Sequence, residues 1–272
     1  MTKRREFIKQ TVLGSAGIAI GGVALSARSY RSVQGANDRI NVAVIGIRGQ
    51  GGTHISNFGL IKDTKNVRIM MLCDVDEQYF PDRVKNVLDR TGETPATVWD
   101  MRRVFDNKDI HAVSFATPNF WHALGTVWAC QAGKDVYVEK CPSHSIWEGR
   151  KMVEAARKYK RIIQVGYQNR SGAYNFAARD YIAGGKLGQV VHIRIYNLLN
   201  GKKWMPQPVA EVPSTLDWDA WLGPAPYTAF NPDRLNGWLF YYDYCPGILD
   251  DASHQLDLVR MVMGDPGHPR SV

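Results

Sequence analysis

Short apolar runs alternate with longer amphipathic stretches from residue 39 onward. The apolar runs predict β-strands at Arg39–Ile45, Val67–Asp74, Ala112–Ala116, Asp135–Val138 and Ile162–Val165. The stretches between them have helical periodicity and predict helices at Thr53–Ile61, Tyr79–Arg90, Phe120–Ala132 and Ile146–Tyr159. Strands that alternate with helices of this length indicate βαβ units, which build a doubly wound parallel sheet. We therefore predict an α/β Rossmann domain over residues 39–166.

The pattern changes after the last of these strands. We expect a helix over Tyr174–Ile182, and alternation of apolar and polar residues over Val190–Asn197 predicts a strand. A long loop region, Gly201–Gly247, follows. Its aromatic residues either stack on sugar rings or fill a core, and a core is expected for most of them: Trp204, Trp218, Trp221, Trp238, Tyr241, Tyr242 and Tyr244. Residues 167–272 are therefore expected to begin a second, substrate-binding domain.

The first 38 residues are interpreted as an export signal and a linker. A basic segment containing Arg4 and Arg5 precedes an uncharged run rich in Gly and Ala, Thr11–Ala27. At about 17 residues this run only just reaches the roughly 17–25 that a bilayer span requires, so a removable signal is favoured over a membrane anchor. The RR-x-F-I-K pattern resembles a twin-arginine signal, which implies the twin-arginine translocation machinery as a partner. A periplasmic or otherwise exported location is expected.

Composition and charge exclude some classes of protein. The chain has 272 residues, of which 44% are hydrophobic, and a net charge of +8. No run of five or six basic residues occurs, so a nucleic-acid partner is not expected. The four cysteines, Cys73, Cys130, Cys141 and Cys245, lack CxxC spacing, so no metal site is expected either. Cys73 and Cys130 lie among apolar residues and are predicted to be buried.

A glycine-rich turn follows the first predicted strand. It contains Gly46, Arg48, Gly49, Gln50 and Gly51. Such a turn lets the backbone approach a pyrophosphate, and the following helix supplies free N–H groups at its N-terminus. Asp74 ends the next strand, 23 residues beyond Gly51, where a carboxylate can accept hydrogen bonds from the adenosine ribose. These features predict NAD, with NADP less favoured because the carboxylate repels a 2′-phosphate.

Two features of this turn leave alternatives open. Arg48 occupies the position of the second glycine of the strict G-x-G-x-x-G pattern. Its guanidinium is placed to contact phosphate, which weakens the preference for NAD over NADP. An ordinary tight turn followed by a solvated strand end is the alternative to a dinucleotide site.

Five segments in order resemble the Gfo/Idh/MocA (glucose–fructose oxidoreductase and inositol dehydrogenase) family. They are AVIGIRGQGGTH, LCDVDE, FATPNFWHA, GKDVYVEKCPSH and VGYQNRS. A further segment, GILDDASHQLDLVRMVMG, resembles the D-x-x-x-H segment of that family, so the likeness extends from Arg39 to Gly264. It implies an open, mostly antiparallel sheet in the second domain and a homo-oligomer for the full-length protein. Because the chain ends at Val272, before several strands of that sheet, a truncated second domain is expected.

The same resemblance implies roles for particular residues. Lys140 follows an apolar strand, where a ligand crevice is expected, and its ammonium would stabilise negative charge that develops on a reacting oxygen. The family pattern is E-K-P, and here Cys141 is inserted before Pro142. Other positions match residues that line the cofactor: Thr117, Pro118, Asn119, His122, Glu139 and Gln168. His54 is expected to be structural.

Asp250 and His254 form the predicted reacting pair. On a helix their spacing places both side chains on one face. Histidine is suited to accept a proton near neutral pH, and a neighbouring carboxylate would orient its ring. Asp251 and Asp257 are also within reach, and the family match favours Asp250. A helix-capping aspartate beside a hydrogen-bonded histidine is the structural alternative.

The expected function is therefore that of an NAD-dependent oxidoreductase acting on CH–OH groups. It would transfer a hydride between nicotinamide and a secondary hydroxyl of a sugar, polyol or related carbohydrate, with Lys140, Asp250 and His254 as catalytic residues. One alternative is an NAD-dependent glycoside hydrolase that acts by transient oxidation, which suits an exported protein without a soluble NAD pool. The other is a non-catalytic sugar-binding protein that retains NAD.

Overall fold

The computed structural model describes residues 39–196, 207–247 and 249–267. The predicted export signal and Trp204 lie outside these residues. Within them, no helix combines the length and the apolar character that a bilayer crossing requires.

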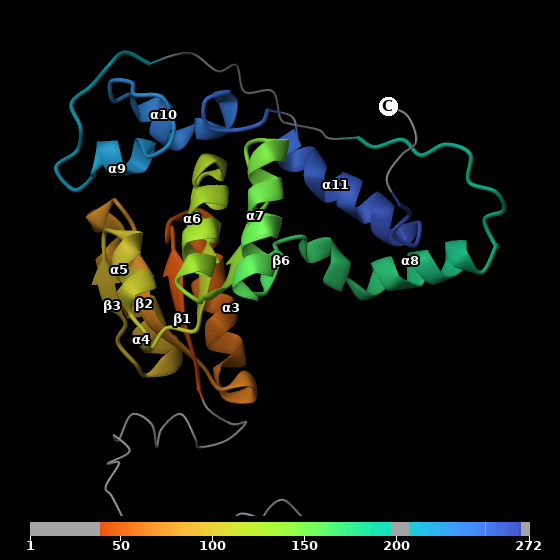
Figure 1. The fold of residues 1–272 in the computed structure, drawn as a ribbon, viewed down its shortest axis with the longest axis horizontal. Helices are drawn as coiled ribbons and strands as arrows, with labels where there is room; N and C mark the ends of the chain where they lie inside the picture. The colour runs from red at the N-terminus through yellow and green to blue at the C-terminus, as the bar shows by residue number, and fades with distance from the viewer. Residues whose placement is uncertain (1–38, 197–206, 248, 268–272) are drawn as a thin grey trace, which may run out of the picture. The chain divides into compact units, whose positions relative to one another are not determined.

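A parallel sheet forms the first part of the described chain (Figure 1). Its strands are β1 (Ile40–Ile45), β2 (Val67–Cys73), β3 (Ala96–Val98), β4 (Ala112–Phe115), β5 (Asp135–Val138) and β6 (Ile163–Val165). They lie in the order β3-β2-β1-β4-β5-β6, and every neighbouring pair is parallel. This is the doubly wound order of dinucleotide-binding domains, so the predicted Rossmann sheet is confirmed. The short strand β3 was not predicted, because three residues are too few to establish a periodicity.

Helices connect the strands. Their bounds are α3 (Gly49–Lys65), α4 (Phe80–Thr91), α5 (Met101–Asp106), α6 (Asn119–Gln131) and α7 (Ile146–Tyr159). Helices α6 and α7 pack side by side (Figure 1). Helix α7 begins with a capping box, in which Ser145 and Glu148 exchange side chain-to-backbone hydrogen bonds. Helix α3 begins earlier than predicted, inside the glycine-rich turn, so the N–H groups of its first turn lie directly beside the end of β1.

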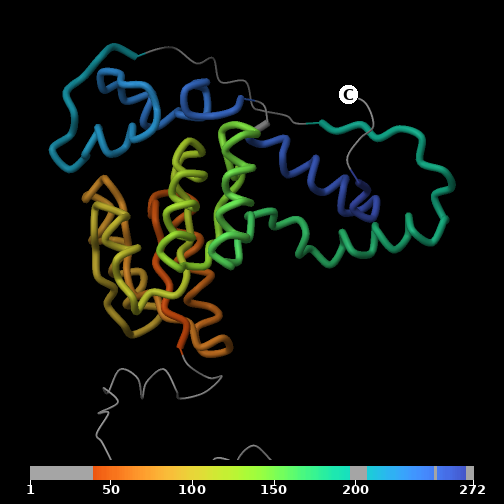
Figure 2. Tube along the Cα trace, in the orientation of Figure 1, coloured from red at the N-terminus to blue at the C-terminus, as the bar shows by residue number. Residues whose placement is uncertain are grey.

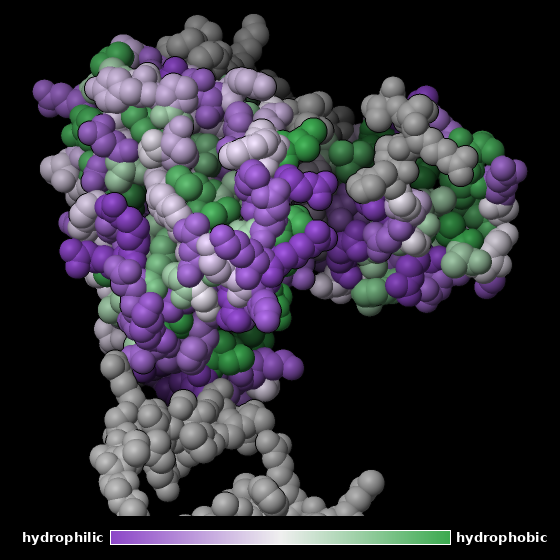
Figure 3. Space-filling model, viewed as in Figure 1, coloured by the Kyte–Doolittle hydropathy of each residue, from purple (hydrophilic) through white to green (hydrophobic). Residues whose placement is uncertain are grey.

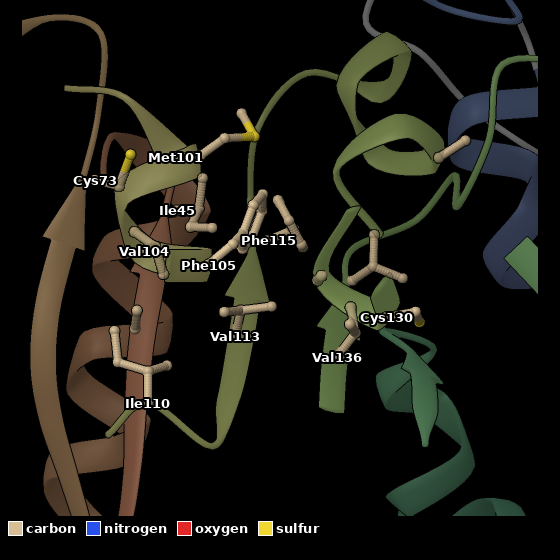
Figure 4. Close-up of a cluster of buried hydrophobic side chains, with 14 of the residues drawn as sticks. Ile45, Cys73, Met101, Val104, Phe105, Ile110, Val113, Phe115, Cys130 and Val136 are labelled. Atoms are coloured by element: carbon tan, nitrogen blue, oxygen red, sulfur yellow. The ribbon is translucent and has the colours of Figure 1, made fainter. Parts of the chain in front are cut away.

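Both faces of the sheet are buried, as the long apolar strands require. Successive side chains of β1 point to opposite faces. Val42 and Val44 belong to an apolar cluster with Ile55 of α3. Ala43 and Ile45 belong to a second cluster, and Figure 4 shows part of it, with side chains from β1, β4, β5 and their neighbouring helices directed together.

The rest of the described chain is helical or irregular. It contains α8 (Ala173–Ala183), α9 (Trp218–Leu222), α10 (Pro232–Asn236) and α11 (Leu249–Val262), with 3-10 turns at Glu77–Tyr79, Gln168–Ser171 and Trp238–Phe240. Helix α8 matches the predicted helix and packs against α11 (Figures 1 and 2). Arg170 strengthens this arrangement, because its guanidinium donates to Asp257 of α11 and to Asp265.

The strand predicted over residues 190–197 is not formed. Residues 190–196 carry no regular structure, and residue 197 lies outside the described part. A strand needs a hydrogen-bonded neighbour, and no segment among the described residues pairs with this one. Val191 is 86% exposed and Tyr196 is 67% exposed. Figure 3 shows apolar surface over this stretch and the end of α8. The expected antiparallel sheet is not seen in the described residues.

An aromatic cluster packs over the N-terminal end of α6. Its buried members are Phe120, Leu216, Trp218, Trp221, Leu222, Phe230 and Tyr244. The Trp121 indole N–H donates to the Trp221 carbonyl, and Asp217 N–H donates to the Val75 carbonyl, which ties the cluster to the sheet. The predicted core role is confirmed for Trp218, Trp221 and Tyr244, whereas Tyr242 is 80% exposed.

Replacing Trp218 by alanine tests this cluster. Trp218 is 5% exposed, and its ring stacks on Trp221 with centroids 4.6 Å apart. We expect Trp218→Ala to lower the free energy of unfolding by about 3–5 kcal/mol, measured by denaturant titration. Trp147→Ala is the matched control, because Trp147 is 68% exposed and its loss should change stability by about 0.5 kcal/mol at most. Equal losses in the two variants would show that the cluster is not a core.

Candidate active site

A cavity of about 600 Å³ lies where the strands of the sheet end. Its size is that of a small-molecule or cofactor site. The predicted site residues on its wall are Gly46, Arg48, Gly49, Gln50, Asp74, Thr117, Pro118, Asn119, Glu139, Lys140, Gln168, Asp250 and His254. Two predicted residues, Gly51 and His122, are not on the wall. Segments separated by more than 200 positions in the chain thus meet at one site.

The glycine-rich turn closes tightly against the neighbouring strand. Gly46 has φ +78°, and a Cβ there would lie 2.8 Å from the backbone of Ala116 and Thr117. A Cβ on Gly51 would lie 1.9 Å from the Gly46 carbonyl oxygen, so Gly51 lets α3 approach the turn instead of touching a ligand. No side chain caps α3, which leaves backbone N–H groups at its N-terminus available to an anion. These residues therefore fit a pyrophosphate.

Asp74 is less free than predicted. Its carboxylate accepts from the Ile47 N–H at 2.8 Å and from the Asp76 N–H at 3.0 Å. Burial raises the pKa of Asp74, and these backbone hydrogen bonds act against that rise. Asp76 also lines the cavity and is 2% exposed, with Thr215 donating to it at 2.9 Å. Sequence reasoning missed Asp76, although the D-x-D spacing of LCDVDE was a usable signal.

Residues of α10 and the following turn face this end of the cavity. Leu235, Asn236 and Trp238 line it, and sequence reasoning had not assigned them to the site. The Arg48 guanidinium donates to the Asn236 side chain and lies over the Tyr79 ring, 5.5 Å from its centroid. The Arg48 side chain therefore links the glycine-rich turn to the end of α10.

Lys140 and Asp250 form an ion pair within the cavity. The Lys140 Nζ atom lies 2.9 Å from Asp250 Oδ2. The other oxygen, Oδ1, accepts from the Asn119 side chain at 2.7 Å. Asp250 is 5% exposed, so these two contacts are what compensate its buried charge. The pair joins the end of β5 to the first turn of α11 and fixes the ammonium in place.

The predicted Asp250–His254 contact is wrong. Both oxygens of Asp250 are engaged elsewhere, and the buried Nδ1 atom of His254 has no hydrogen-bond partner among the described residues. Asp251 does not replace it, because its carboxylate lies 3.9 Å from the Lys140 ammonium, and Asp257 binds Arg170. A lysine ammonium attracts a carboxylate more strongly than an imidazole does.

His254 nevertheless lies on the cavity wall. Its ring packs edge-on against Tyr167, with centroids 6.0 Å apart. This aromatic contact, and not a carboxylate, orients the imidazole. Lys140 and His254 therefore line the same cavity.

His122 occupies a different place from the one predicted. It is fully buried, with Nδ1 2.6 Å from the Cys141 carbonyl oxygen and Nε2 2.8 Å from that of Thr117. Burial lowers its pKa, against the effect of these carbonyl contacts. The ring connects the turn after β4 to the turn after Lys140. It therefore supports two segments of the cavity wall without being exposed in the cavity.

Glu139 receives several hydrogen bonds next to Lys140. Its Oε1 atom accepts from His54 at 2.9 Å, from Gln168 at 2.9 Å and from Gln50 at 3.3 Å. Burial opposes ionisation of this carboxyl, but the hydrogen bonds outweigh it and hold the pKa of Glu139 below its ordinary value. Residues of α3, of the 3-10 turn at Gln168 and of the segment after β5 thus form one hydrogen-bonded group at the cavity.

A doubly wound sheet with a glycine cradle at its carboxyl edge is typical of dinucleotide-binding domains. Residues 40–167 match the family described as "Oxidoreductase family, NAD-binding Rossmann fold", and residues 190–272 match "Oxidoreductase family, C-terminal alpha/beta domain". The chain therefore belongs to the Gfo/Idh/MocA oxidoreductase family.

Named relatives and solved structures are similar at low identity. Inositol 2-dehydrogenase of Rubrobacter xylanophilus is 29% identical over 60% of this chain and 45% of its own length. A glycosyl hydrolase family 109 protein of Solibacter usitatus is 29% identical over 70% of this chain and 44% of its own length. An oxidoreductase domain protein from Kribbella flavida has a TM-score of 0.60 at 23% identity, covering 83% of this chain and 54% of that protein, which shows the fold alone. The chain spans less than half the length of the inositol 2-dehydrogenase and of the glycosyl hydrolase family 109 protein.

The close packing of the glycine-rich turn can be tested with two alanine variants. Gly51→Ala should displace α3 from β1, because the added Cβ would overlap a backbone oxygen. We expect unfolding free energy to fall by about 1–3 kcal/mol, with weaker NADH binding in a fluorescence titration. Gly49→Ala is the stability control, since a Cβ there meets no atom within 4 Å. Equal destabilisation in both variants would contradict this packing.

A double-mutant cycle tests the Lys140–Asp250 ion pair. Lys140→Met and Asp250→Leu should each destabilise the protein, because each leaves a buried or half-buried charge unpaired. The double variant should be more stable than the sum of the two losses predicts, with a coupling energy of about 1.5–3 kcal/mol in denaturant titrations. The exposed pair Lys85–Asp89 should show little coupling in the same cycle. If the losses of unfolding free energy at Lys140 and Asp250 were additive, the two side chains would not form an ion pair.

Proposed function

We propose that this chain is the cofactor-binding part, with some of the substrate-binding part, of an NAD-dependent oxidoreductase. The substrate class is a secondary hydroxyl of a sugar, polyol or related carbohydrate. One observation carries the proposal: Lys140, held 2.9 Å from Asp250, shares a cavity with His254 and with the glycine-rich turn. The family match and the likeness to an inositol 2-dehydrogenase support it.

The cavity residues suit a dinucleotide whose pyrophosphate lies at the start of α3. Free N–H groups at the start of α3 would hold its pyrophosphate. When bound, the nicotinamide ring supplies a hydride acceptor or donor. We favour NAD over NADP because Asp74 and Asp76 both line the cavity beside the end of β2. Arg48 is the residue that opposes this preference, and its link to Asn236 keeps it from approaching a 2′-phosphate freely.

Lys140 and His254 have complementary tasks in the proposed reaction. The Lys140 ammonium would donate to the reacting oxygen and stabilise the negative charge that develops as the proton leaves. His254 would accept that proton, because its ring lies on the cavity wall and a histidine is suited to this task near neutral pH. Asp250 would act on the reaction through Lys140, by holding the ammonium in position.

A redox-neutral glycoside hydrolase is the second candidate. The likeness to a glycosyl hydrolase family 109 protein, which extends over 70% of this chain, favours it. The same lysine and histidine would serve a transient oxidation of a glycoside. Incubation with NAD⁺ and a panel of inositols, sugars and aryl glycosides separates the two. NADH or a keto product identifies a dehydrogenase, and aglycone release without net NADH identifies a hydrolase.

Export and assembly belong to the same proposal. The RR-x-F-I-K pattern near the N-terminus supports export by the twin-arginine route to the periplasm, after the cofactor has been acquired. The exposed apolar side chains after α8, such as Leu187 and Val191, support a homo-oligomer or further covering structure in the whole protein.

Replacing His254 tests its role as the base. We expect His254→Ala to lower kcat by about 10²–10⁴-fold, the usual contribution of a positioned base, with little change in the dissociation constant for NADH. Initial rates and fluorescence titrations give these two quantities. His192→Ala is the control, because His192 is exposed and lies outside the cavity. Unchanged turnover in His254→Ala would remove the assigned role, and a wild-type protein that binds NADH without any turnover would favour a sugar-binding protein.

A further inference from the structure

Three buried polar side chains connect the middle of the sheet to the cavity. The Ser114 hydroxyl on β4 lies 2.8 Å from His54 Nδ1, and His54 Nε2 lies 2.9 Å from Glu139 Oε1. Ser114, His54 and Glu139 are 1%, 5% and 6% exposed. Buried polar groups cost stability unless they are fully paired, so a chain of three at this position calls for a reason.

The order serine, histidine, carboxylate resembles that of a hydrolytic nucleophile, but the geometry excludes that role. Ser114 is enclosed and is not on the cavity wall, so no substrate can reach its hydroxyl. Glu139 is the member that faces the cavity. The hydrogen-bonded series Ser114–His54–Glu139 therefore runs from an inaccessible hydroxyl to an accessible carboxylate. Its function must lie at the carboxylate end.

The two oxygens of Glu139 have different surroundings. Oε1 accepts from His54, Gln168 and Gln50, whereas no described group is hydrogen-bonded to Oε2. A Cβ on Gly166 would lie 3.0 Å from Oε1, so the backbone after β6 packs directly against this side of the carboxylate. Glu139 is thus fixed in one orientation with one oxygen left for a ligand. An ionised carboxylate only accepts hydrogen bonds, so the matching ligand group is a hydroxyl or an amide N–H.

We propose that His54 and Ser114 are positioning residues that hold Glu139 as the acceptor for a hydrogen-bond donor of the bound dinucleotide. This inference rests on the proposed NAD-dependent function. Glu139 can only accept, so His54 Nε2 carries the hydrogen and donates to it. In the neutral ring Nδ1 then accepts from the Ser114 hydroxyl, and every polar atom between the sheet and Glu139 Oε1 is paired.

The charge of Glu139 depends on this arrangement. The ionisable groups around it are His54 from α3, Tyr137 from β5, His122 from α6 and the adjacent Lys140. Burial opposes the charge, and the hydrogen bond from His54 is the leading contribution that lowers the pKa of Glu139. Without that donor the pKa of Glu139 should rise, because burial opposes the charged form. Because the charged form is the acceptor, binding would then weaken as the pH falls through the raised pKa, whereas wild-type binding is retained there.

The test measures the dissociation constant for NADH by fluorescence titration of the whole chain between about pH 5 and pH 8, the range in which such a shift is visible. His54→Leu should bind NADH about 10–100-fold more weakly, the loss of one hydrogen bond to a charged group, and should lose further affinity toward low pH. His54→Gln keeps an N–H donor and should recover most of the affinity and the flat pH profile. Ser114→Ala should have a smaller effect of the same kind.

Ile55→Ala is the matched control for lost packing. Ile55 is the next residue of α3 and is fully buried, in the apolar cluster that contains Val42 and Val44. It should lower thermal stability without a new pH dependence. Wild-type affinity and pH profile in both His54→Leu and Ser114→Ala, or the same profile in His54→Leu and Ile55→Ala, would overturn the inference. The readout is binding alone, so a wild type that binds NADH but does not turn over carbohydrates would refute the proposed reaction and leave this inference intact.

Discussion

All strands of the sheet run in one direction, so the segments that follow β1, β2, β4 and β5 emerge along one edge. Several groups suited to a dinucleotide site are placed there by that single constraint. The free N–H groups follow β1, the two carboxylates follow β2, and Lys140 follows β5. Burial of both faces of the sheet by helices leaves this edge as the accessible one, and the cavity forms along it.

The Lys140–Asp250 ion pair extends this edge to the second part of the chain. It joins positions 110 residues apart and, with Asn119, compensates the one aspartate charge buried in the first turn of α11. The same pairing leaves His254 without a carboxylate partner. The Asp250 carboxylate therefore orients the Lys140 ammonium and not the His254 imidazole, so the lysine and the histidine are held by different contacts.

The parts of the account that depend on local pattern were predictable from the sequence. Strand and helix alternation predicted the sheet, and the glycine-rich turn predicted the cradle beside β1. Long-range pairing was not predictable from the sequence. The four-residue spacing predicted that Asp250 contacts His254, but the Asp250 carboxylate binds Lys140, which follows the distant strand β5. Residues 190–196 show the same limit, because alternation records a tendency while a strand needs a neighbour. His122 matched a cofactor motif, yet its burial is visible only in three dimensions.

A crystal structure of the protein with bound NADH tests the central claim most directly. The account predicts that the pyrophosphate lies against the N-terminus of α3, beside Gly46, and that the nicotinamide ring occupies the part of the cavity lined by Glu139, Lys140 and His254. A nicotinamide ring bound away from Lys140, or a dinucleotide seated outside this cavity, would contradict it.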